Sequence, residues 1–219
     1  PNTAESSFYG MIKGVEDYLN DHKIRKITEM GPNPDPERVA ELINRRPRVE
    51  KLAIKDVKLR TFITDDEHRD DMVTHVYDIT YGTVRAGIDN IVIIDDSIVR
   101  GTTLKKSIIK MLSRLQPKSV VIVSSAPQIR YPDCYGIDMA KIGDFIAFKA
   151  ATELLHERGL WHVVNDAYAE ALEMEKEGTF QSRNCLQKIY EPFSYAEISA
   201  KIAELVTDKD IECNVQVVY

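Results

Sequence analysis

The chain has 219 residues, of which 43% are hydrophobic and 29% charged, and its formal net charge is −6 at pH 7. Such a chain is long enough to bury a core without disulfides or a structural metal, and its acidic balance argues against a general nucleic-acid binder. No apolar run approaches the roughly 20 residues that span a bilayer, and no secretory leader is recognisable. We therefore expect a cytoplasmic protein that does not associate with membranes.

The first quarter of the chain predicts helices and then a strand. Apolar residues recur at helical spacing over residues 2–22. A turn precedes a second, shorter helix over 36–45, for which Asp35 suits the N-cap and Pro36 the first helical position. Residues 51–63 look strand-like at their ends, and a polar stretch follows.

The middle of the chain carries the clearest pattern. The continuous apolar run Ile91–Ile94 is typical of a strand buried on both faces, as in a parallel sheet. Apolar residues at helical spacing over 104–115 predict a helix that Pro117 ends, and 120–123 is a second β-branched run. Strand, helix and strand in this order predict a βαβ unit with parallel strands.

The remainder is predicted to be mostly helical. Helical periodicity and an alternating tail predict three helices and a final half-buried strand, at 143–158, 162–177, 194–206 and 211–217. We therefore predict a doubly wound α/β fold: a mostly parallel sheet with helices on both faces. Its core is expected in residues 1–140, and a helical C-terminal extension that packs on this core in 141–219.

A candidate ligand site follows the first buried strand. Asp95 and Asp96 end that strand, and the turn SIVRGTT leads into the next helix. A helix N-terminus suits a phosphate, Gly101 lets the backbone approach a ligand, and Thr102 and Thr103 add hydroxyl donors. Two adjacent acids beside a phosphate would repel it unless they bind ribose hydroxyls or a Mg²⁺ ion.

Other interpretations of this turn are weaker. Asp-Asp-Ser could merely cap a helix, but that does not explain two buried strands, paired acids and a Gly-Thr-Thr helix entry together. The P-loop pattern GxxxxGK[ST] and the dinucleotide fingerprint GxGxxG are both absent.

Four segments resemble type I phosphoribosyltransferases, and in particular the glutamine phosphoribosylpyrophosphate amidotransferases. VIIDDSIVRGTT at 92–103 is similar to the motif with which these enzymes bind phosphoribosyl pyrophosphate (PRPP), and SSAPQIRYPDCYGIDM at 124–139 is similar to a second characteristic stretch. Pro-Asn-Thr at 1–3 and KDVKLRTFI at 55–63 add shorter likenesses. The resemblance covers residues 1–140 and implies the type I phosphoribosyltransferase fold.

The resemblance implies roles for three groups of residues. It places Asp95 and Asp96 at the ribose and Mg²⁺, with Thr3 as a third residue on the metal side. It assigns five residues to the loop around the 5′-phosphate: Ser97, Arg100, Gly101, Thr102 and Thr103. The region that closes over pyrophosphate would contain Lys55 and Arg60.

The same resemblance implies an activity and its partners. The reaction would transfer the phosphoribosyl group of PRPP to ammonia, giving 5-phosphoribosylamine and pyrophosphate, the first step of de novo purine biosynthesis. Mg²⁺ is the implied cofactor, purine nucleotides are the implied feedback inhibitors, and the full-length protein is expected to be a homo-oligomer. These enzymes carry an N-terminal glutaminase domain whose first residue is Cys. Because this chain starts at Pro1, we expect that domain to be absent from it.

Some family members also hold an iron–sulfur cluster. Cys134 lies near the place of one cluster ligand, but Cys185 and Cys213 form no later pair, and the chain has no CxxC spacing. We therefore predict no cluster and free thiols.

Two alternative functions stay open. One is phosphoribosyl transfer to a nucleobase. The other is a non-catalytic PRPP or nucleotide sensor, because residues 55–75 hold four basic and six acidic side chains, an unusual charge for a segment that closes over pyrophosphate. Asn2, where the family often has Asp, favours the sensor as well.

Overall fold

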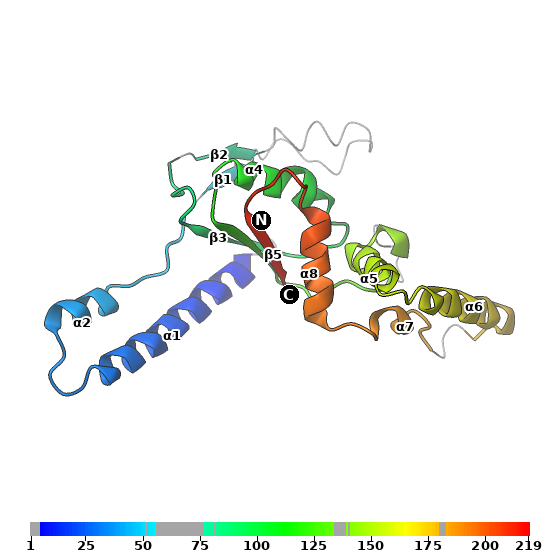
Figure 1. The fold of residues 1–219 in the computed structure, drawn as a ribbon, viewed down its shortest axis with the longest axis horizontal. Helices are drawn as coiled ribbons and strands as arrows, with labels where there is room; N and C mark the ends of the chain where they lie inside the picture. Colours follow the sequence, from blue (N-terminus) through cyan, green and yellow to red (C-terminus); the bar gives the residue numbers. More distant parts are fainter. Residues whose placement is uncertain are drawn as a thin grey trace. The chain divides into compact units, whose positions relative to one another are not determined.

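The computed structural model describes residues 5–50, 52–55, 77–80, 82–133, 139, 141–179 and 183–219. The chain divides into two compact units, Pro1–Leu52 and Ala53–Tyr219. Each is described by itself below, and Figure 1 follows the order of their elements by colour. The boundary predicted after residue 140 falls inside the second unit and stays a prediction.

The first unit consists of two helices, α1 (Glu5–Glu29) and α2 (Pro36–Ile43). The predicted start of α2 is confirmed: the Asp35 side chain accepts a hydrogen bond from the Glu37 backbone N–H at 3.1 Å, and Pro36 follows it. α1 continues past its predicted end at residue 22, because the sequence from there to residue 30 contains neither glycine nor proline.

The second unit contains two sheets and a series of helices (Figure 1). Its elements, in chain order, are β1 (Ala53–Lys55), β2 (Tyr77–Ile79), β3 (Asn90–Asp95), the π-helix η2 (Leu104–Ile108), α4 (Ile109–Ser113), β4 (Ser119–Ser124), the 3₁₀ turn η3 (Ile142–Asp144), α5 (Ile146–Glu157), α6 (His162–Glu177), α7 (Gln187–Tyr190), α8 (Tyr195–Val206) and β5 (Asn214–Val218). β1 and β2 are antiparallel, whereas β3, β4 and β5 form a parallel sheet in that order.

The parallel sheet confirms the predicted βαβ unit and corrects one detail of it. On the central strand β4, Val120 and Ile122 are fully buried, and Ile109 of α4 is buried as well. β3, by contrast, is not buried on both faces: the Val92 side chain is 50% exposed. Within the described residues β3 is an edge strand of the sheet, whereas the more deeply buried β4 is central.

The helices of the C-terminal part form largely where the sequence predicts them. α6 has the predicted bounds and ends at Gly178, which adopts a left-handed conformation with φ 67°. α8 begins with a capping box in which Ser194 and Glu197 bond to each other's backbone N–H groups. β2 and α7, each four residues or fewer, were not predicted. None of the described helices is long and apolar enough to cross a membrane.

Candidate functional site

The two longer segments of the resemblance, 92–103 and 124–139, meet at the carboxyl end of β3. Asp95 is the last residue of β3, and its neighbour on β4 is Ser124. Beyond Ser124 the Ser125 backbone N–H donates to the Asp95 carbonyl oxygen at 2.9 Å, and that of Ala126 donates to the Asp96 carbonyl oxygen at 3.0 Å. The Ser125 hydroxyl also donates to the Asp96 carbonyl, at 3.0 Å. The acid pair is therefore fixed by the start of the loop that follows β4.

The surroundings of Asp95 and Asp96 disfavour the ionised form of Asp95. Burial and, to a smaller extent, the adjacent charge of Asp96 raise the pKa of Asp95 from 3.8 to about 6. A backbone hydrogen bond acts in the opposite direction, since the Asp96 N–H donates to Asp95 Oδ1 at 3.0 Å. Next along the chain, the Ser97 N–H donates to Asp96 Oδ1 at 2.9 Å. A cation or a set of hydroxyl donors bound here would relieve this repulsion.

The turn after the acids is anchored by packing. Ile98 is buried, and the Ile146 backbone N–H donates to the Val99 carbonyl oxygen at 2.8 Å. Gly101 has φ +70°, and a Cβ atom added to it would lie 2.9 Å from Val206 Cγ1 and 3.3 Å from Ile146 Cγ1. The structure thus gives its own reason for this glycine: the missing side chain makes room for α5 and α8. Close approach of a ligand to its backbone stays a prediction.

The turn leads into an accessible helix entry. The first backbone hydrogen bond of the helix runs from Lys105 N to Gly101 O at 3.0 Å, so the N–H groups of Thr102 and Thr103 have no acceptor within the helix. Both threonines are exposed. Free N–H groups, two hydroxyls and the positive end of the helix dipole make this entry suitable for an anion.

Arg100 adds a cation beside the entry. Its guanidinium lies 3.8 Å from a carboxylate oxygen of Asp144 in η3, and both side chains are largely exposed. An ion pair this long and exposed contributes little to stability.

The remaining predicted site residues are not tested by the described part of the chain. Lys55 ends β1 and pairs in register with Tyr77 of β2, but its side chain is not described. Thr3, Arg60 and Cys134 lie outside the described residues, as does most of the segment expected to close over pyrophosphate. Cys185 and Cys213 are free thiols. The absence of an iron–sulfur cluster stays a prediction.

The loop after β4 is fastened by a polar cluster that the sequence did not reveal. Buried Gln128 donates from Nε2 to the Tyr195 carbonyl and to Ser199 Oγ, both at 2.9 Å. The Arg130 guanidinium donates to Gln128 Oε1 and stacks on the Tyr195 ring, 3.9 Å from its centroid. The Tyr190 hydroxyl donates to the Arg130 carbonyl at 2.7 Å. Apart from Arg130 and Gln128, these partners lie about 60 to 70 residues apart in sequence, so no local pattern signals them.

Within the described residues, no group of three or more His, Cys, Asp or Glu side chains is placed to hold a metal ion.

Comparisons with known proteins show local similarity to amidophosphoribosyltransferases. The chain is 48% identical over 64 residues to that of Pseudomonas aeruginosa, over 58 residues to that of Escherichia coli and over 59 residues to that of Schizosaccharomyces pombe. These matches cover 26–29% of this chain and only 11–13% of the relatives' own length. No protein-family model matches the chain.

Proposed function

We propose that the second unit is a type I phosphoribosyltransferase domain that binds PRPP at the carboxyl end of β3. The observation that carries the proposal is the junction of Asp95 and Asp96 with the loop after β4, next to the exposed helix entry at Thr102 and Thr103. The names of the similar proteins support the same substrate. The activity that fits best is transfer of the phosphoribosyl group to ammonia.

The acid pair suits a Mg²⁺ ion that arrives with the substrate. Mg²⁺ is usually bound through one or two carboxylates together with substrate phosphates and water. Asp95 and Asp96 offer two adjacent carboxylates, and burial together with the charge of Asp96 raises the pKa of Asp95. When bound there, Mg²⁺ would neutralise charge on the pyrophosphate leaving group.

The neighbouring residues would hold the other end of the substrate. The backbone N–H groups and hydroxyls of Thr102 and Thr103 would bind the 5′-phosphate, with Ser97 and Arg100 on its flank. A phosphate there lies beside the acids, so the ribose can reach the carboxylates while its phosphate stays on the helix entry. The carboxylates would accept hydrogen bonds from the ribose hydroxyls.

In this reaction the protein acts through positioning and electrostatics. The bond between the anomeric carbon and pyrophosphate breaks with its electron pair leaving on oxygen, and the ammonia lone pair forms the new carbon–nitrogen bond. A proton then passes from nitrogen to solvent. Positive charge develops on the ribose ring, which Asp95 and Asp96 would stabilise at short range. The step needs no covalent nucleophile.

The test has a binding arm and a turnover arm. Calorimetry should show binding of Mg–PRPP to the 219-residue chain and its loss in the Asp95→Asn, Asp96→Asn double variant, with circular dichroism as the control for folding. Ammonia-dependent release of pyrophosphate with formation of phosphoribosylamine would establish the transfer. Unchanged binding in the folded double variant would refute the site.

The turnover arm also separates the alternatives. Tight PRPP binding without turnover would favour the sensor, and pyrophosphate release that depends on an added nucleobase would favour a nucleobase phosphoribosyltransferase.

A further inference from the structure

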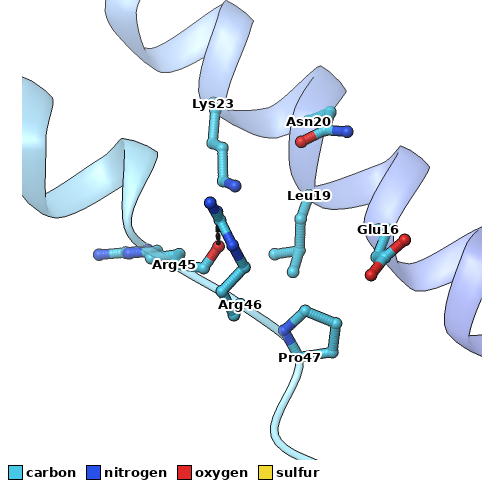
Figure 2. A pocket seen from close by; sticks show the side chains of 7 residues that line it. All are labelled: Glu16, Leu19, Asn20, Lys23, Arg45, Arg46 and Pro47. Carbon is cyan, nitrogen blue, oxygen red and sulfur yellow. Dashed lines mark hydrogen bonds between the residues drawn. The ribbon is translucent and has the colours of Figure 1, made fainter.

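The first unit contains a hollow whose charges are not balanced within the protein. It has a volume of about 240 Å³ and lies between α1 and the residues that follow α2. Lys23 and Arg46 point toward one another at one end of it, Glu16 lies at the other end, and Leu19 and Pro47 lie between them (Figure 2).

Neither Lys23 nor Arg46 is paired with a carboxylate of any residue that the structure describes. Lys23 is half-buried and makes no ion pair or hydrogen bond with any residue that the structure describes. Arg46 is oriented by its own backbone, because its Nη1 donates to the Ile43 carbonyl at 2.7 Å and to the Arg45 carbonyl at 3.1 Å.

The acidic residue Glu41 on α2 does not pair with Lys23 or Arg46. Glu41 is 3.3 Å from the Arg45 guanidinium and is paired with it. Lys23 and Arg46 therefore repel each other across the hollow, and an anion between them would remove that repulsion.

We infer that this hollow binds a small hydroxylated phosphate monoester. A phosphate monoester carries up to two negative charges near pH 7 and so balances both cations, and the planar donor fork of Arg46 matches its oxygen atoms. The volume is below the range of pockets for drug-sized ligands, which favours a small molecule over a large one.

The far end of the hollow defines the rest of the ligand. Leu19 and Pro47 form an apolar middle, and the Glu16 carboxylate lies beyond it, while the Asn20 amide lies on α1 between Lys23 and Glu16. An amide and a carboxylate accept hydrogen bonds from hydroxyl groups, whereas a second phosphate there would be repelled by Glu16. A monoester with hydroxyls at its other end fits this arrangement, and the site is independent of the one at β3.

The experiment is a titration of the ¹⁵N-labelled 219-residue chain, with the Arg46 Nε–H resonance as the probe, at constant ionic strength. Glycerol 3-phosphate, inorganic phosphate and acetate are the three ligands. The amide resonances of Thr102 and Thr103 are followed in the same spectra, so that anion binding in the second unit is measured separately. We expect a saturable shift of Arg46, with glycerol 3-phosphate binding more tightly than phosphate, and acetate binding most weakly.

Two variants test the charges. Lys23→Gln should weaken binding of glycerol 3-phosphate by about threefold to tenfold, the loss expected for one partly exposed charge contact. Lys13→Gln is the matched control, because Lys13 is on the same helix but is paired with Asp17 and does not line the hollow. The inference is overturned if Arg46 shows no saturable shift, if both variants bind equally, or if acetate binds as tightly as glycerol 3-phosphate.

Discussion

Replacing Asp95 with Asn should stabilise the folded chain at neutral pH while removing Mg–PRPP binding. Burial and the charge of Asp96 raise the pKa of the Asp95 carboxyl to about 6, so its ionised form is less favourable in the folded than in the unfolded state. Asn keeps the oxygen that accepts the Asp96 backbone N–H at 3.0 Å but carries no charge. The substitution therefore removes the electrostatic cost and retains the local hydrogen bond.

The size of the effect follows from the pKa. A rise from 3.8 to about 6 corresponds to about 3 kcal/mol at most. Because the side chain is only half-buried, solvent screening reduces this to about 1–2 kcal/mol, or roughly 2–8 °C in the melting temperature of a chain of this size. The cost is present above pH 6 and disappears below pH 3.8, where the carboxyl is protonated in both states. The advantage of the variant should therefore shrink as the pH falls from 7.5 to 5.

Thermal denaturation of both proteins at pH 7.5, 6 and 5 measures this difference, and other acids that titrate in both proteins cancel in it. Glu173→Gln, on the exposed side of α6, is the control for loss of a carboxylate as such. A variant that is less stable than the parent chain at pH 7.5, or an advantage that is the same at pH 5, would refute the reasoning. If calorimetry shows that the variant keeps its affinity for Mg–PRPP, the proposed role of Asp95 in binding is refuted.

Four further predictions follow from particular contacts and from the proposed function. Gly101→Ala should cost about 1–3 kcal/mol in urea denaturation, since φ is +70° and the new Cβ would lie 2.9 Å from Val206; the same substitution should cost less when it is made in a Val206→Ala background. Ser194→Ala should cost about 1 kcal/mol by loss of the bond that its hydroxyl accepts from the Glu197 N–H; an unchanged melting temperature would contradict the cap. Arg100→Gln should weaken PRPP binding by about tenfold in calorimetry with little change in stability, because its ion pair is exposed. With glutamine as sole nitrogen source, mass spectrometry should detect no glutamate, since the proposed reaction takes its nitrogen from free ammonia.

The sequence alone determined those elements whose causes are local. The periodicity of 162–177 and a following glycine define α6, and Ser194 with Glu197 defines the start of α8, because each signal acts over three or four residues. The apolar runs of β3 and β4 and the helix between them predicted parallel pairing for the same reason: a short crossover leaves few alternatives. The position of the acid pair at a strand end was likewise predictable.

The tertiary structure decided what depends on residues distant in sequence. Only the fold places Val206 and Ile146 against Gly101, and only the fold buries Asp95, which is the largest cause of its raised pKa. The exposure of Val92 was also beyond the sequence, because an apolar strand has the same composition at the centre of a sheet and at its edge. The place of β5 beside β4 followed from packing across nearly 90 residues of intervening chain, over which a sequence pattern carries no information.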